Sequence, residues 1–109
     1  MKYYRQGDVA IIPISAFPEN LTPVDRDNDR VVLAYGEVTG HAHAIAAEDV
    51  ELFFAPGEAS IMAERYLRVG SAGAVLVHEE HAPITLPPGK YEVRHQREYA
   101  PAELRQVAD

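Results

Sequence analysis

Hydrophobic and β-branched residues occur in short runs along this chain, and prolines and glycines separate the runs. Such a pattern predicts β-strands joined by turns. We expect strands over residues 8–14, 30–35, 41–46, 50–55, 60–69, 74–79, 84–86 and 90–99, with 60–69 forming one strand or two. Short strands at this spacing predict an all-β fold, either a single-domain barrel or a two-sheet sandwich. Residues 101–107 predict a short C-terminal helix, because Pro101 suits a first helical turn.

Two segments interrupt the regular pattern. Pro13 lies inside the run 8–14 and lacks an amide hydrogen, which predicts an edge strand or a bulge. Residues 15–30 contain Pro18, Pro23 and an acidic cluster at 25–29. We expect a long polar loop there, and long loops in compact domains are functional or mobile.

Side chains alternate between the two faces of a strand, so His41 and His43 share one face of the strand 41–46. Ile45 continues that face, which we expect to look into a barrel or cleft. Small alanines occupy the opposite face, at positions 42, 44 and 46, and predict close packing against a neighbouring element.

The last predicted strand, 90–99, has one wholly polar face, formed by its even-numbered residues, and this face is expected to meet solvent. The inward face carries Tyr91, Val93, His95, Arg97 and Tyr99. A histidine and an arginine therefore stand between tyrosines on a face that is predicted to be inward.

Composition and charge argue against several classes of function. A chain of 109 residues is expected to form one domain, residues 1–109, and its formal net charge of −7 argues against nucleic-acid and membrane binding. Without cysteine, only histidine and carboxylate side chains remain as strong metal ligands. The N-terminus lacks the apolar stretch of a signal peptide, and we expect a cytoplasmic protein.

The histidines suggest a metal site. His41 and His43 with a nearby carboxylate, Glu48, are three ligands that a divalent transition metal prefers, whether Zn, Fe, Mn or Ni. His81, from the cluster His78-Glu79-Glu80-His81, is the predicted fourth ligand, and His95 is a further candidate. The alternative is that these are structural histidines, bonded to carbonyl groups or tyrosines.

We predict a substrate site from His95, Arg97 and Tyr91 on the inward face of the last strand. A guanidinium can hold a carboxylate through two parallel hydrogen bonds, so Arg97 could clamp a small anionic metabolite. The structural alternative is an ion pair between Arg97 and Asp8 or Glu98.

Gly36, His41, His43 and Glu48 stand in the order of the first cupin motif, which the chain resembles, and Gly57 stands two residues later than the closing glycine of that motif. The turn Pro87-Pro88-Gly89 is similar to the start of the second motif. The resemblance implies a jelly-roll-like barrel with one metal ion. Glu92 occupies the usual place of the third histidine but lies on the predicted solvent face, so His81 or His95 is the better candidate.

The chain is also similar to small bacterial proteins that carry Gln6-Gly7-Asp8, His41-Ala42-His43 and His78-Glu79-Glu80-His81, a resemblance that implies no function. Two hypotheses follow from the sequence. The first is a cupin-like metal protein acting on a small anionic metabolite. The second is a non-catalytic module that forms a homo-oligomer through sheet edges and exposed tyrosines, Tyr3, Tyr4 and Tyr99.

Overall fold

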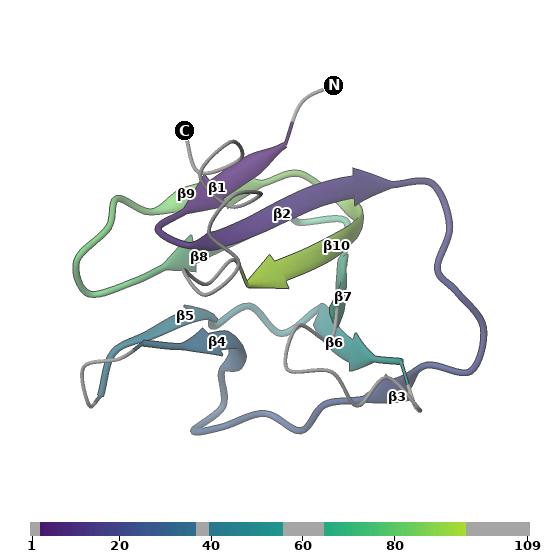
Figure 1. Ribbon diagram of the computed structural model, residues 1–109, viewed down its shortest axis with the longest axis horizontal. Coiled ribbons are helices and arrows are strands. Elements are labelled where there is room, and N and C mark those ends of the chain that lie inside the picture. Colours follow the sequence, from purple (N-terminus) through teal and green to yellow (C-terminus); the bar gives the residue numbers. More distant parts are fainter. Residues whose placement is uncertain (1–2, 37–39, 56–64, 96–109) are drawn as a thin grey trace, which may run out of the picture.

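The computed structural model of the chain describes residues 3–36, 40–55 and 65–95, and every regular element within them is a β-strand (Figure 1). The strands are β1 (Tyr4–Gln6), β2 (Val9–Ile14), β3 (Thr22–Pro23), β4 (Val31–Tyr35), β5 (Ala42–Ile45), β6 (Val50–Phe54), β7 (Arg65–Val69), β8 (Ala74–Val77), β9 (Ile84–Leu86) and β10 (Gly89–His95). The predicted all-β fold is confirmed for this part of the chain. The predicted C-terminal helix, 101–107, lies outside the described residues.

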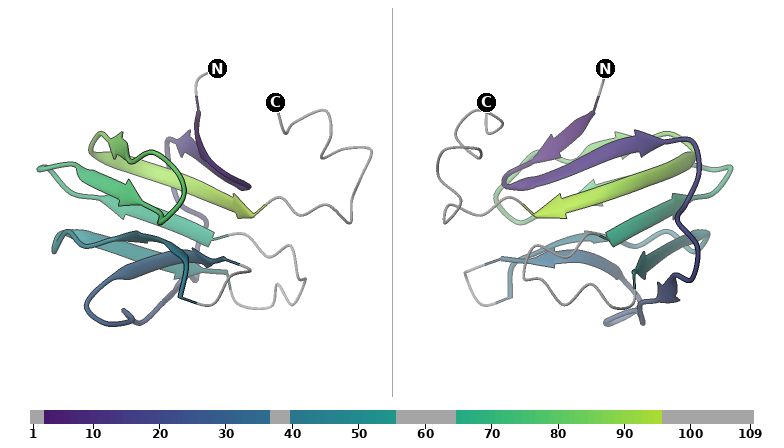
Figure 2. Two further views of the ribbon diagram at one scale, coloured as in Figure 1. Left: turned by 90° about the vertical axis from the view of Figure 1, so that its left-hand side faces the viewer. Right: turned by 45° about the vertical axis from the view of Figure 1, so that its right-hand side comes forward.

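The strands form two antiparallel sheets. One has the order β1-β2-β10-β7-β6-β3, and the other has the order β4-β5-β8-β9. The long strands β2 and β10 pair from Val9–His95 to Ile14–Lys90, and Figure 2 shows them side by side in purple and yellow-green. The two sheets do not close into a barrel, so of the two predicted architectures the two-sheet arrangement is the one observed.

The hydrophobic core lies between the sheets, because both contribute to one cluster of buried side chains. Ile11, Leu52 and Leu67 come from the larger sheet, and Ile45 and Leu76 come from the smaller one. Each of these five side chains is almost fully removed from solvent. Burial of aliphatic side chains of this size supplies about 1.5–3 kcal/mol each, which makes this cluster the main source of stability.

Each of the eight predicted strands has a counterpart in the structure, most of them with shorter bounds. The run 74–79 ends as a strand at Val77, and residues 78–83 form a loop before β9. Two short strands, β1 and β3, were not predicted. Residues 60–64 and 96–99 of two predicted strands lie outside the described residues.

The prediction of an edge strand or a bulge at Pro13 is met only locally, because β2 is an inner strand that lies between β1 and β10. β1 pairs with β2 only as far as Ile11, whereas β10 continues along β2 to Ile14. Pro13 therefore lies beyond the end of β1, where no strand among the described residues pairs with this side of β2 and an amide hydrogen is not needed for pairing there.

The long loop between β2 and β4 is tied down by one arginine. The Arg26 guanidinium donates hydrogen bonds to the main-chain carbonyls of Asp29, Ala47, Glu48 and Val50. Two of these carbonyls belong to the connection between β5 and β6 and a third, that of Val50, to the first residue of β6, so Arg26 fastens the polar loop to this part of the chain.

The strand β5 is buried on both faces. His43 and Ile45 share the face that looks toward the core, and Ile45 belongs to the main cluster. Ala42 and Ala44 pack with Val32 in a separate small cluster on the other face. The close packing predicted for the alanine face is therefore confirmed for these two residues.

Candidate metal centre

The five histidines of the chain gather at one end of the two sheets. The His43 ring lies 4.3 Å from the His78 ring, and His78 lies 5.7 Å from His41 and 4.7 Å from His81, measured between centroids. His95 is connected to this group through the carboxylate of Asp8. We call the four contacting rings the histidine cluster.

Strand register explains why residues so distant in sequence meet here. β5 pairs with β8 at Ala44–Val77 and Ile45–Leu76. One step further along this antiparallel register sets His43 opposite His78. The cluster is therefore built where the β5–β8 ladder ends and the loop 78–83 begins.

Gln6 fixes the orientation of His43. The Gln6 side-chain amide nitrogen donates to the carbonyl oxygens of Leu76 at 3.1 Å and Ala82 at 3.0 Å. With its NH₂ group so engaged, Gln6 presents its oxygen, Oε1, 2.8 Å from His43 Nδ1. An amide oxygen only accepts, so Nδ1 carries the hydrogen and His43 Nε2 keeps its lone pair.

His43 is uncharged at neutral pH. Its side chain is 3% exposed, and burial together with the neighbouring His78 lowers its pKa from 6.5 to about 4, with Asp8 opposing part of the effect. A neutral imidazole with a free nitrogen is the form that binds metal ions.

Asp8 connects His43 with His95. Its Oδ2 accepts a hydrogen bond from His95 Nε2 at 3.0 Å, while its Oδ1 lies 3.8 Å from His43 Nε2. Asp8 is placed here by a two-residue hairpin turn, Gly7-Asp8, between β1 and β2, and His95 pairs with the adjacent Val9. Gly7 has φ of +61°, as the first central position of a type II′ turn requires.

Gly7 also makes room for His81. A Cβ atom at position 7 would lie 2.8 Å from His81 Nε2, closer than such atoms approach. The absence of a side chain at Gly7 thus lets the His81 ring lie directly against the turn, which brings it 6.0 Å from the His43 ring in a stacked orientation.

One group of side chains has the spacing of a metal site. His41, His78 and Glu79 each offer a ligand atom, and these atoms lie within 4.8 Å of one another. Glu79 Oε1 accepts the amide hydrogen of Ala42 at 2.9 Å, and this bond holds the pKa of Glu79 below its usual range. The carboxylate is therefore charged and held beside the two imidazoles.

His78 has one hydrogen bond that a metal ion would replace. The amide of Glu80 donates to His78 Nδ1 at 3.0 Å, which leaves the ring proton on Nε2. An ion held at Nδ1 would use the lone pair that accepts this hydrogen bond, and an ion held at Nε2 would require the ring proton on Nδ1. In either case this exposed hydrogen bond would be lost, at a cost of about 1 kcal/mol.

The residues predicted as ligands are brought together only in part. His41, His43 and His81 belong to the cluster. Glu48 lies exposed in the connection after β5, where its carbonyl bonds to Arg26. Glu79 holds the position beside the imidazoles that was predicted for Glu48.

Of the residues predicted to bind a substrate, only His95 lies near the histidine cluster among those that the structure describes. His95 lies beside Asp8 at the margin of the cluster. Tyr91 is 3% exposed, packs edge-on against Tyr4, and donates its hydroxyl hydrogen to the Pro87 carbonyl, which makes it part of the core. Arg97 lies outside the described residues.

The alternation predicted for the last strand is confirmed over residues 91–95. Tyr91 and Val93 are buried in the core, and His95 continues their face. Glu92 lies on the opposite face, where it accepts a hydrogen bond from Arg94 at 3.0 Å. It is therefore separated from the face that carries His95.

Gln6, Asp8 and Glu79 were not predicted as site residues. Strand alternation carries no information about pairing between β1, β5 and the loop 78–83, so the role of Gln6 could not be deduced from spacing. The one available signal was the occurrence of Gln6-Gly7-Asp8 together with the two histidine motifs.

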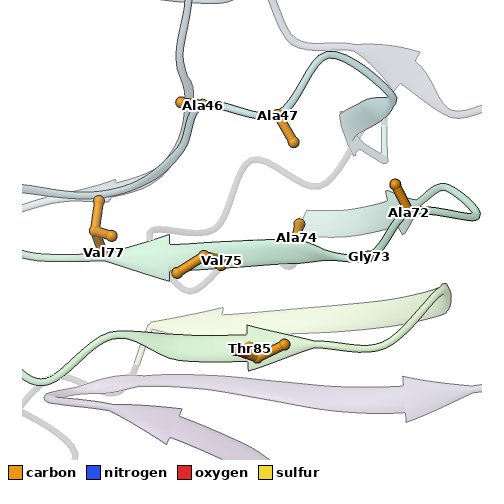
Figure 3. Close-up of a pocket in the computed structure, with 8 residues that line it drawn as sticks. All are labelled: Ala46, Ala47, Ala72, Gly73, Ala74, Val75, Val77 and Thr85. Carbon is orange, nitrogen blue, oxygen red and sulfur yellow. The ribbon is translucent and has the colours of Figure 1, made fainter.

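A separate hollow of about 400 Å³ lies on the smaller sheet (Figure 3). It is lined by small and β-branched residues: Ala46, Ala47, Ala72, Gly73, Ala74, Val75, Val77 and Thr85. Val75 and Val77 are 47% and 45% exposed, which is high for valines. This hollow contains no histidine and is chemically distinct from the histidine cluster.

The sequence matches a family model described as Domain of unknown function (DUF8820) over residues 5–96, and the chain therefore belongs to this family. The matched span includes the Gln6-Gly7-Asp8 turn and all five histidines. Comparisons with curated proteins and with solved structures gave no match. Among residues 3–36, 40–55 and 65–95, no helix has the length and hydrophobicity of a membrane span.

Proposed function

We propose that this protein binds a divalent transition metal ion through His41, His78 and Glu79. The observation that carries the proposal is the convergence of these three ligand atoms within 4.8 Å. Two imidazoles and one carboxylate suit Zn, Fe, Mn or Ni and leave coordination positions open. The cupin resemblance, which rests on His41 and His43, also implies a metal-binding protein.

The surroundings favour a cation over a free anion. Asp8, Glu79 and Glu80 place three carboxylates around the cluster, and His43 is neutral. A small anionic metabolite would be repelled by these groups until a metal ion is bound. We therefore propose that such a metabolite binds second, with its oxygen atoms at the open positions of the metal.

Glutamine substitutions at two glutamates test the ligand assignment. Glu79→Gln removes the proposed carboxylate ligand with little change of shape, and we expect zinc affinity to fall by about tenfold or more, since ligands and their supporting groups have effects of this order. Glu48→Gln is the matched control, because Glu48 is exposed on the connection that Arg26 holds. The zinc affinity of this variant should equal that of the wild type. Zinc titration against a chromophoric chelator measures both. Equal affinities for Glu79→Gln and the wild type would contradict the assignment.

A second candidate function is supported by the hollow beside Val75 and Val77. Two exposed valines on one strand face are suited to contact with another protein surface, including a second copy of this chain. The double substitution Val75→Thr with Val77→Thr retains β-branching while adding hydroxyl groups. If the protein is a homo-oligomer through this face, the substitution should weaken association by about tenfold, as measured by sedimentation velocity. A monomeric wild type would exclude a second copy of this chain as the partner of this face.

A further inference from the structure

We infer that His43 and Asp8 form a second cation position beside the first, for a divalent transition metal ion. The position lies between His43 Nε2 and Asp8 Oδ1, which are 3.8 Å apart. It uses neither His41, His78 nor Glu79 and therefore does not depend on the proposed function. The contact between the rings of His43 and His78 places the two positions next to each other.

His43 Nε2 and Asp8 Oδ1 face each other at this position. Gln6 accepts the hydrogen of His43 Nδ1, so Nε2 is an electron-pair donor. Asp8 Oδ1 is a carboxylate oxygen and also only accepts. Two electron-pair donors that face each other repel, and a separation of 3.8 Å is too long for a hydrogen bond between them. An electropositive group between them would turn this repulsion into attraction.

Both residues are held in place from behind. Gln6 is 2% exposed and makes two further hydrogen bonds, to Leu76 and Ala82, so the His43 ring is anchored to the smaller sheet. His95 Nε2 donates to the other carboxylate oxygen of Asp8 and anchors it to β10. Such supporting hydrogen bonds to a ligating imidazole and a ligating carboxylate are characteristic of metal sites.

The spacing also suits a metal ion. Zinc binds imidazole nitrogen and carboxylate oxygen at about 2.0–2.2 Å, so two ligands at the tetrahedral angle are roughly 3.4 Å apart. A decrease of about 0.4 Å in the separation of Nε2 and Oδ1 would reach this value. Asp8 is partly exposed and sits on a turn, so the small movement does not disturb the core.

Zinc stoichiometry tests the inference. Equilibrium dialysis followed by metal analysis should give a second equivalent of zinc in the wild type. Asp8→Asn should remove this equivalent and keep the first, because the amide has no charge and can donate to His43 Nε2. Asp25→Asn, in the exposed polar loop, is the matched control and should retain both. The double variant His41→Ala with His78→Ala should lose only the first equivalent.

The ¹⁵N resonance of His43 Nε2 provides a readout that needs no variant. Coordination should shift this resonance on zinc addition, whereas a bound water alone would leave it unchanged. A single equivalent, lost in the His41/His78 variant and without a shift at His43 Nε2, would overturn the second position and leave the proposed function standing. No zinc at all would contradict both, and two equivalents that persist in Asp8→Asn would contradict the second position alone.

Discussion

Replacement of Gln6 by leucine is expected to lower the free energy of unfolding by about 3 kcal/mol. Gln6 makes three buried or partly buried hydrogen bonds, with His43, Leu76 and Ala82. Leucine fills a similar volume but leaves the His43 N–H and two carbonyl oxygens without this partner. Each unsatisfied buried group costs about 1–3 kcal/mol, and a small domain has only about 5–15 kcal/mol of stability in total.

Urea denaturation followed by circular dichroism measures the effect, since the chain has no tryptophan. The experiment is run with a chelator so that metal binding does not contribute to stability. Thr85→Val, at an exposed position of β9, is the control and should change the free energy of unfolding by less than about 0.5 kcal/mol. A Gln6→Leu variant as stable as this control would show that the three hydrogen bonds do not stabilise the fold.

The metal-free protein is expected to lose stability as the pH falls from 6.5 to about 4. His43 has a pKa of about 4 in the folded state and 6.5 when exposed. Between these values the unfolded chain binds a proton that the native chain does not, so protonation favours unfolding. The contribution of His43 to the free energy of unfolding is complete above pH 6.5. It decreases by up to about 3 kcal/mol as the pH falls to 4, at about 1.4 kcal/mol per pH unit.

His43→Asn isolates this contribution from the carboxylates that titrate in the same range. Asparagine can donate an amide hydrogen to Gln6 Oε1 but carries no titratable group. The difference in unfolding free energy between wild type and variant should narrow from pH 7 to pH 4.5, as measured by urea titration at each pH. Parallel pH profiles would show that His43 has the same pKa in the native and the unfolded state, which contradicts the prediction.

Local pattern was sufficient to predict much of the fold. Alternation in β10 predicted that Tyr91 and Val93 are buried, and the small alanines of β5 predicted a tightly packed second face. The short strand β1 was missed because Tyr4–Gln6 contains two polar residues and little alternation. Its assignment depends on pairing with β2, which is a long-range property of the folded chain.

The site was less predictable, for a related reason. His41 and His43 could be placed on one face because they are two residues apart. Proximity in sequence predicted that Glu48 is their carboxylate neighbour. In the structure the β5–β8 register brings Glu79 to this place instead, because Glu79 lies in the loop that follows β8. Tyr91 and His95 share a face as predicted, but only His95 is near enough to the end of β10 to reach Asp8.

The histidine cluster joins distant parts of the chain, and this has a consequence for folding. Gln6 bonds to Leu76 across 70 positions, and Asp8 bonds to His95 across 87. Contacts that close such long loops form late and slowly, after the local hairpins. The arrangement of imidazoles described here therefore exists only in a chain whose two sheets have both assembled, so ring contacts observed by NMR during refolding would report completion of the native topology.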